Sequence, residues 1–276
     1  MPASFITVPG IGEIAPGEDL AGTIGGALAA AAITLARHDV LVVAQKAVSK
    51  AERRLVDLTT VMPSAQARTV ATETGKDARV VELILRESTE VVRMKPGVIV
   101  VAHRQGYVMA QAGVDHSNVG PADHVLLLPV DCDASAADLR ARLRQRFGVD
   151  IGVIVSDSFG RAWRKGTVNV ALGVAGLPAI IDRRNERDRY GRVLEGTEIA
   201  FADAIAAGAG IVMGEAAEGT PVVLARGLNW TAPEQTGAAL VRSKAEVAPI
   251  CWMLRRFKFR QPPSAGIDLA PSLCCK

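Results

Sequence analysis

Apolar runs of different length and spacing alternate with polar turns along the chain, and they predict its secondary structure. Short continuous runs rich in β-branched residues predict strands, at 40–44, 125–128, 152–156 and 222–225. Two further apolar runs, 98–102 and 107–110, flank a polar tetrapeptide, which predicts a β-hairpin. The strand at 152–156 is expected to run into a polar loop.

Helices are predicted where a capping residue or a turn precedes residues at helical spacing. They are expected to begin near Asp19 and at Pro63-Ser64, and to cover 77–87, 135–147 and 197–208. Helices and strands interleave, but a hairpin is also present. We therefore predict a mixed α+β fold rather than a regular doubly wound sheet.

Composition narrows the class of protein. The chain has 276 residues, of which 49% are hydrophobic and 22% charged, and this suits one large domain or two lobes that share an interface. The 32 basic and 29 acidic residues give a net charge of only +3, which argues against nucleic-acid binding. An aromatic content of 4% also argues against a stacking surface for single strands.

Cysteine usage and the first residues favour a cytoplasmic protein. Cys132, Cys251, Cys274 and Cys275 form no C-x-x-C pair, which disfavours a disulfide framework and a structural zinc site. The first residues lack the basic and apolar regions of a signal peptide. The uncharged stretch 20–36 is rich in Ala and Gly and short for a bilayer, so we interpret it as a buried helix and expect no membrane partner.

Segment 113–118, Gly-Val-Asp-His-Ser-Asn, is the first of four candidate functional segments. Asp115 and Asn118 follow a strand and a glycine. Short oxygen ligands on a turn suit a hard cation such as Mg²⁺ or Mn²⁺. The alternative is an Asx-turn in which Asp115 only stabilises the loop.

The second segment is 156–164, Ser-Asp-Ser-Phe-Gly-Arg-Ala-Trp-Arg. An apolar strand delivers Asp157 at its end, and Arg161, Arg164 and Lys165 follow closely. A carboxylate beside guanidinium groups indicates either a structural ion pair or a site where metal and phosphate meet.

The other two segments suggest phosphate binding. Lys46 and Lys50 follow the strand 40–44 and are well placed to meet phosphate oxygens, although they are also consistent with ordinary surface lysines. The loop 213–220, Met-Gly-Glu-Ala-Ala-Glu-Gly-Thr, offers backbone N–H groups between its glycines, and Glu215 suits a second metal. The alternative is a plain connection between helix and strand.

Taken in order, the motifs of the chain resemble the coenzyme F-420:L-glutamate ligase family over about residues 8–227. The motifs are Gly10-Ile-Gly-Glu-Ile14, Gly17-Glu-Asp-Leu20, Ala44-Gln-Lys-Ala-Val-Ser-Lys-Ala-Glu52, Val81-Glu-Leu-Ile-Leu-Arg-Glu-Ser88, His103-Arg-Gln-Gly106, Ala112-Gly-Val-Asp-His-Ser-Asn118, Asp157-Ser-Phe-Gly-Arg161, Asp188-Arg-Tyr-Gly-Arg192 and Pro221-Val-Val-Leu-Ala-Arg-Gly227. One such motif means little, whereas the ordered set is highly specific.

The resemblance implies an α+β ligase domain over residues 1–243, built as two interlocked lobes in an intertwined homodimer. Residues 244–276 depart from the family and form a basic and aromatic tail, with its positive charge concentrated at 254–260. The implied reaction is GTP-dependent addition of L-glutamate to the lactyl carboxylate of the deazaflavin cofactor precursor. A second glutamate is then added through its γ-carboxylate.

Site roles carry over from the family by position. Asp115 and Asp157 match ligands of one divalent cation, and Ser158 and Glu215 match those of a second, each Mg²⁺ or Mn²⁺; K⁺ is also implied. The residues that match nucleotide-binding stretches are Ile11, Gly12, Glu13, Ile14, Gln45, Lys46, Lys50, Asn118, Met213, Gly214, Glu215, Ala216, Ala217, Glu218, Gly219 and Thr220.

The chemistry of such a ligase explains these residue types. Amide formation from a carboxylate is uphill in water, so the GTP γ-phosphoryl group must first make an acyl phosphate, with GDP and phosphate as products. Asp115, Asp157 and Lys50 then serve catalysis, because cations must neutralise the transferring group. Arg161 and Arg164 are assigned to grip the carboxylates or the phosphodiester of the substrates, and Arg161 is also counted as catalytic. Alternatives are a γ-glutamyl ligase for another anionic cofactor, of pterin or furan type, and a non-catalytic metal- and nucleotide-binding module.

Overall fold

A mixed five-stranded sheet forms the centre of the computed structural model, which describes residues 2–161, 164–243 and 246. The strands lie in the order β1 (Ser4–Thr7), β12 (Val222–Arg226), β2 (Val40–Ala44), β8 (Gly152–Gly160) and β9 (Thr167–Ala175). Only β2 and β8 pair in parallel, with Ala44 opposite Ser156, and the other pairs are antiparallel. The carboxyl ends of β2 and β8 therefore meet at one edge of the sheet.

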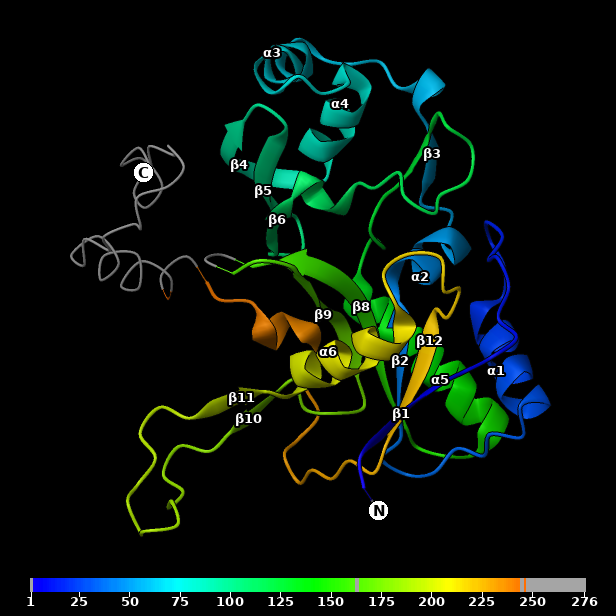
Figure 1. The fold of residues 1–276 in the computed structure, drawn as a ribbon, viewed down its shortest axis with the longest axis vertical. Coiled ribbons are helices and arrows are strands. Elements are labelled where there is room, and N and C mark those ends of the chain that lie inside the picture. The colour runs from blue at the N-terminus through cyan, green and yellow to red at the C-terminus, as the bar shows by residue number, and fades with distance from the viewer. Residues whose placement is uncertain (1, 162–163, 244–245, 247–276) are drawn as a thin grey trace.

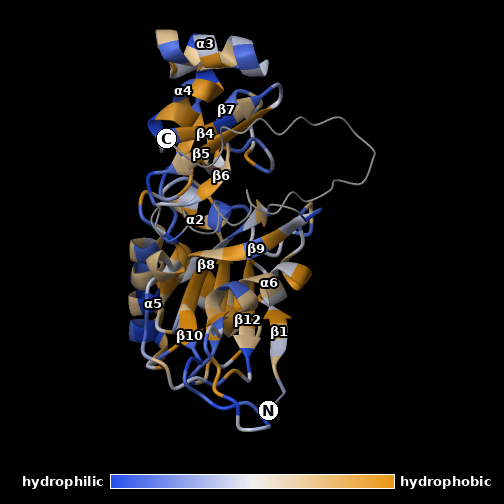
Figure 2. Cartoon of the chain, turned by 90° about the vertical axis from the view of Figure 1, so that its left-hand side faces the viewer, coloured by the Kyte–Doolittle hydropathy of each residue, from blue (hydrophilic) through white to orange (hydrophobic). Residues whose placement is uncertain are grey.

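Helices cover both faces of this sheet (Figures 1 and 2). On one face, α1 (Leu20–Ala30) and α5 (Cys132–Phe147) pack against Leu41 and Val43. On the other, α6 (Phe201–Met213) packs against Val40 and Val42. The side chains of β2 alternate between the two faces, and its first four residues, Val40 to Val43, are fully buried. This explains why the strand appears in the sequence as an unbroken apolar run.

A second region with its own apolar core lies at one end of the molecule (Figure 1). It comprises α3 (Ala65–Thr74), α4 (Ala78–Arg86) and a sheet of β4 (Ser88–Lys95), β5 (Val98–His103) and β6 (Val108–Ala110). The pair β3 (Leu55–Asp57) and β7 (His124–Leu126) and the short helix α2 (Gln45–Ala51) connect it to the central sheet. The pair β10 (Ile180–Asp182) and β11 (Glu198–Ala200) carries an arm, residues 183–197, that extends away from the body. Three 3-10 turns complete the described elements, at Leu58–Thr60, Gln111–Gly113 and Gly237–Leu240.

The α+β prediction is confirmed, as are the helix starts predicted near Asp19 and at Ser64. Asp19 Oδ1 accepts a hydrogen bond of 2.9 Å from Gly22 N, and Ser64 Oγ accepts one of 3.1 Å from Ala67 N, so both residues cap the helices that follow them. The predicted hairpin is also present, with β5 and β6 paired antiparallel around 103–107.

Several elements differ from prediction, two of them because they pair with another segment. The helix predicted over 135–147 begins earlier, at Cys132, because Asp131 caps it. The expected polar loop after Ser156 is instead the continuation of β8 to Gly160, because β9 pairs with it along its whole length. The helix predicted from Thr197 begins at Phe201, because 198–200 pair with β10. The lysine segment after β2 is the helix α2, which the sequence analysis left without a structure.

No helix among the described residues is long and apolar enough to cross a membrane. The stretch 20–36 forms α1 and a following turn, and Ile24 and Leu28 of α1 are fully buried in the core. The predicted tail 244–276, with its basic segment 254–260, lies outside the described residues apart from Glu246.

Candidate active site

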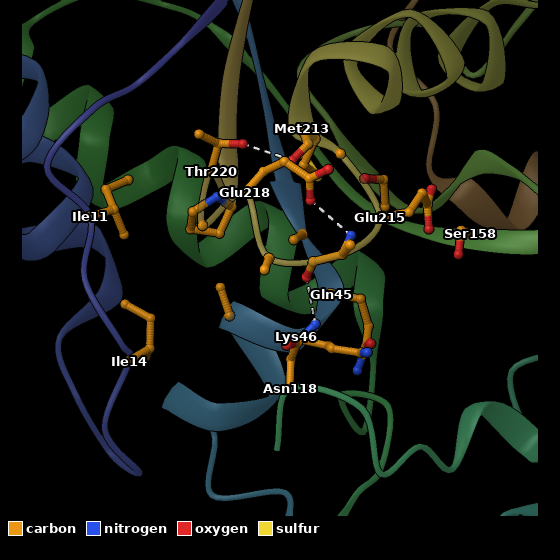
Figure 3. A pocket seen from close by; sticks show the side chains of 18 of the residues that line it. Ile11, Ile14, Gln45, Lys46, Asn118, Ser158, Met213, Glu215, Glu218 and Thr220 are labelled. Carbon is orange, nitrogen blue, oxygen red and sulfur yellow. Dashed lines mark hydrogen bonds between the residues drawn. The ribbon is translucent and has the colours of Figure 1, made fainter. Parts of the chain in front are cut away.

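A cavity of about 510 Å³ opens at the edge where β2 and β8 end. Ligands of α/β proteins commonly bind outside the carboxyl ends of adjacent parallel strands. Four separate parts of the chain line the cavity: the segment after β1, helix α2 with the end of β2, the β8–β9 pair, and the loop after α6. All the residues that the sequence assigned to nucleotide binding, from Ile11 to Thr220, line this single cavity. Figure 3 shows Ile11 and Ile14 on one side of it and Ser158 and Glu215 on the opposite side.

Helix α2 presents both lysines to the cavity. Lys46 and Lys50 are four residues apart, so they lie on the same side of the helix. Lys46 Nζ is 2.6 Å from Asp115 Oδ2 and also donates to the backbone carbonyl and the hydroxyl of Ser117. Lys50 Nζ donates to Glu13 and, over 2.7 Å, to the carbonyl oxygen of Asn118. Lys50 is only 8% exposed, so the surface-lysine interpretation is wrong for this residue.

The segment 113–118 forms the predicted Asx-turn, and its aspartate also contacts the site. Ser117 N donates to Asp115 Oδ1 over 2.9 Å, while Asp115 Oδ2 faces Lys46. Burial alone would disfavour the charged form of Asp115. The hydrogen bonds from Lys46 and Ser117 outweigh it, so the pKa of the Asp115 carboxyl lies below its usual value. Asn118, at φ 56°, donates from Nδ2 to the carbonyl of Ala216 over 3.0 Å and so joins this turn to the loop after α6.

The pKa of the Asp157 carboxyl is shifted in the opposite direction, upward. Burial raises the pKa of its carboxyl to about 6, although Ser158 N donates to it and the charge of Lys46 lowers the pKa. The negative charges of Asp115 and Glu215 raise it further. Asp115, Asp157 and Glu215 are therefore close enough to interact electrostatically, although they come from three distant parts of the chain.

The charges around the cavity favour a bound cation. Lys46 and Lys50 are outnumbered by carboxylates, which are Glu13, Asp115, Asp157, Glu215 and Glu218. A polyphosphate would be repelled by this set unless cations entered with it. The available donors are carboxylate, hydroxyl and carbonyl oxygens, which suit Mg²⁺ or Mn²⁺. In the described part of the chain, no three His, Cys, Asp or Glu side chains gather as a complete metal cage. Water and ligand oxygens would therefore have to complete the coordination, as is usual for Mg²⁺.

Arg161 and Arg164 do not line the cavity. Both are exposed and lie in the turn between β8 and β9, where Arg164 N donates to the carbonyl of Arg161 over 3.3 Å. No ion pair between described residues joins Asp157 to either arginine, so the structural ion pair considered for this segment is not formed.

Two polar residues that line the cavity, Ser156 and Asn169, were missed by the sequence analysis. Ser156 was assigned to the end of a strand and given no role. Asn169 is the one polar side chain between Val168 and Ala175. A single amide inside an otherwise apolar strand was the available signal, because buried polar groups need partners.

Known proteins resemble this chain over the part that contains the cavity residues. The family model described as F420-0:Gamma-glutamyl ligase matches residues 10–227. A "Coenzyme F420:L-glutamate ligase" of Methanopyrus kandleri is 49% identical over 216 residues, which cover 78% of this chain and 83% of the relative. Proteins of the same name from Methanothermobacter thermautotrophicus and Methanocaldococcus jannaschii are 44% and 42% identical, over 83% and 75% of this chain and 91% and 83% of theirs.

An α+β fold with a charged cavity at the edge of its sheet is matched along most of its length by proteins named as ligases, which gives the class as a ligase. The chain belongs to the F420-0:gamma-glutamyl ligase family.

The raised pKa of Asp157 predicts how stability depends on pH in the metal-free protein. The pKa of Asp157 in the folded protein, about 6, lies above its usual value. The contribution of this carboxyl to the free energy of unfolding is therefore fully present at low pH and is lost as pH rises through about 6. Asp157→Asn keeps an acceptor for Ser158 N but carries no charge. In EDTA at pH 8 we expect Asp157→Asn to raise the free energy of unfolding by about 2 kcal/mol.

Urea denaturation at pH 5 and pH 8 measures this effect, and the difference between Asp157→Asn and the unchanged chain should shrink at pH 5. Asp138→Asn is the matched control, because Asp138 is exposed on α5. An Asp157→Asn variant no more stable than the unchanged chain at pH 8 would contradict the prediction.

Proposed function

We propose that this chain is a GTP-dependent ligase that adds L-glutamate to the coenzyme F-420 precursor. The relatives carry the name of that activity, and the observation that supports it most is that Lys46, Lys50, Asp157 and Glu215 line one cavity, with Asp115 paired to Lys46 beside it. The first glutamate joins the lactyl carboxylate by an amide bond, and the second is linked through the γ-carboxylate of the first.

The reaction has two transfers. An oxygen of the acceptor carboxylate attacks the γ-phosphorus of GTP, the bond to the β–γ bridging oxygen breaks, and GDP leaves with that oxygen. The neutral amine of glutamate then attacks the carbon of the acyl phosphate. Inorganic phosphate leaves with the C–O electron pair, and the amine gives up a proton to form the amide.

The cavity suits a nucleotide lying across it. Ile11 and Ile14 provide an apolar wall for a base, and the opposite side carries Ser158 and Glu215 (Figure 3). Between them, Lys46 and Lys50 are in reach of the phosphates. The loop from Met213 to Thr220 has Gly214 and Gly219 at positive φ, 78° and 66°, a conformation that favours glycine and brings backbone close to a ligand.

Divalent cations fit the donor set described above, with Asp115 and Asp157 holding one and Ser158 and Glu215 the second. Such a cation, Mg²⁺ or Mn²⁺, would supply neutralisation of the triphosphate and polarisation of the transferred phosphoryl group. K⁺ remains part of the proposal on family resemblance alone.

Replacing either aspartate should abolish ligation. For Asp115→Ala and Asp157→Ala we expect GDP release to fall at least about 100-fold, since loss of one preorganised charge-stabilising group typically costs that much. The assay contains purified protein, GTP, Mg²⁺, L-glutamate and the deazaflavin precursor, with the product identified by mass spectrometry. GDP should appear only when glutamate and acceptor are both present.

Asp138→Ala controls for loss of a carboxylate away from the cavity. Metal-dependent GDP release that survives both alanine substitutions would rule out the proposed site. Binding of GTP without GDP release under any condition would instead favour the non-catalytic module, and release with a pterin- or furan-type acceptor alone would favour the other ligase.

Arg161 and Arg164 remain assigned to the substrate. Their exposed position beyond the cavity suits the anionic acceptor, whose far end would project from the site. Arg161→Ala should raise the KM for the acceptor about tenfold while leaving the KM for GTP unchanged, because a hydrogen bond to a charged group is lost. Arg68→Ala, an exposed arginine on α3, is the control. Unchanged kinetics for both L-glutamate and the acceptor would refute the assignment.

A homodimer also belongs to the proposal. Tyr190 and Val193 on the arm are 89% and 48% exposed, and Ile211 on the outer side of α6 is 84% exposed. An extended arm with apolar side chains on its surface suits packing against a second copy.

Light scattering after gel filtration should give twice the 29.0 kDa mass of one chain. A Tyr190→Glu/Ile211→Glu double variant should elute as a monomer, because two charges would be buried at the interface. Met62→Glu, at a 77% exposed site in the other region, should remain dimeric. A monomeric unchanged chain would refute the dimer.

A further inference from the structure

The Asn169 side chain is a buried polar group without a protein partner. Asn169 is 8% exposed and lines the cavity from β9. No hydrogen bond between described residues involves its side-chain amide. The residue is largely buried, yet its amide lines the cavity, where a ligand can reach it.

The neighbours of Asn169 fix the direction of this amide. In the β8–β9 register Asn169 lies opposite Ser158, so the two side chains share one face of the sheet. Helix α6 passes over that face at Gly210, where an added Cβ atom would lie only 2.4 Å from Asn169 Oδ1. The amide oxygen is therefore packed against the helix backbone.

A second unpaired polar atom lies on the same face. Ser156 is 1% exposed, and its buried hydroxyl has no hydrogen-bond partner within the described part of the chain. Ser156 lies opposite Ala171, two positions along β9 from Asn169. The β8–β9 pair thus presents two neighbouring polar side chains, Ser156 and Asn169, that have no hydrogen-bond partner among the described residues.

Both lysines of the cavity already have carboxylate partners, Lys46 with Asp115 and Lys50 with Glu13. A neutral amide donor can bind an anionic oxygen without attracting the surrounding carboxylates. It also keeps its donors at every pH. Its place opposite Ser158 puts it on the side of the cavity where the proposed second cation, and an anion bound to that cation, would lie.

We infer that Asn169 is a further binding residue, whose Nδ2 donates hydrogen bonds to an anionic oxygen of a bound phosphate or carboxylate. The inference rests on the proposed function for the identity of these anions. The same chemistry has two sources, the phosphates of the nucleotide and the carboxylates of L-glutamate, and the experiment separates them.

The test compares Asn169→Ala and Asn169→Asp with the unchanged chain. Calorimetry with GDP and Mg²⁺ measures the nucleotide Kd, and the GDP-release assay measures the KM for L-glutamate. Loss of a hydrogen bond to a charged group should raise one of these constants at least about tenfold in Asn169→Ala, and further in Asn169→Asp through charge repulsion. A raised Kd for GDP identifies phosphate, and a raised KM for glutamate with unchanged Kd identifies carboxylate.

Two further variants separate binding from a structural role. Gly210→Ala keeps the amide but displaces it, so it should weaken the same constant. Asn229→Asp makes the same amide-to-acid change at an exposed site and should have no effect. Because Asn169 has no protein partner, Asn169→Ala should not lower the Tm of the ligand-free protein, whereas a structural asparagine would.

Unchanged constants in both Asn169 variants, or tighter GDP–Mg²⁺ binding by Asn169→Asp, would overturn the inference. The second result would mean that the side chain faces a cation rather than an anion. If the unchanged chain releases no GDP, the proposed function fails, and the calorimetric Kd alone then decides the role of Asn169. If it does release GDP while the variants behave like it, only the role of Asn169 is refuted.

Discussion

The parallel pairing of β2 with β8 is the constraint on which the site depends. It places Ala44 opposite Ser156, so Lys46, which follows β2, and Asp157, which follows Ser156 within β8, come close together. The remaining groups join them on loops held by hydrogen bonds to these elements or to one another. The Asp115 turn is held by Lys46, and Asn118 then holds the loop after α6 through Ala216. A shift of one residue in this pairing would turn each side chain of a strand to the opposite face and separate the charges.

This arrangement concentrates negative charge where the proposed substrates are themselves anionic. Asp115 is kept ionised by Lys46, whereas burial and its acidic neighbours hold the pKa of Asp157 near 6. A carboxylate with a raised pKa destabilises the fold when it ionises, and such groups are typical of functional sites, where a ligand can compensate the charge. Lys50 differs, because Glu13 and the carbonyl oxygen of Asn118 already hold this buried lysine without a ligand.

The sequence patterns correctly predicted the elements that depend on contacts between residues close together in the chain. Asp19 and Ser64 cap helices through contacts within three residues, and β2 is apolar throughout because both of its faces are covered. The Asx-turn at Asp115 is local as well. The extension of β8 to Gly160 is not local, since Asp157, Ser158 and Gly160 form a strand only because β9 pairs with them. For the same reason Arg161 and Arg164, adjacent to Asp157 in the sequence, lie in a turn beyond the cavity. The grouping of Ile11, Asn118 and Glu215 around one cavity followed from family resemblance, and no local pattern could have supplied it.

Asn169 and Gly210 illustrate a kind of site residue that local patterns cannot assign. On β9 the amide interrupts an apolar run, which by itself indicates only a polar group that must find a partner. The partner expected in a protein interior is another polar group of the chain, yet α6 offers a glycine there, and the glycine provides room without a hydrogen bond. Ser156, two positions along the same face, is likewise unpaired. Two neighbouring polar groups without partners are costly in a site that serves only the fold. They are less costly in a site where an anion supplies the missing acceptors, because the donors are then already oriented when the ligand binds.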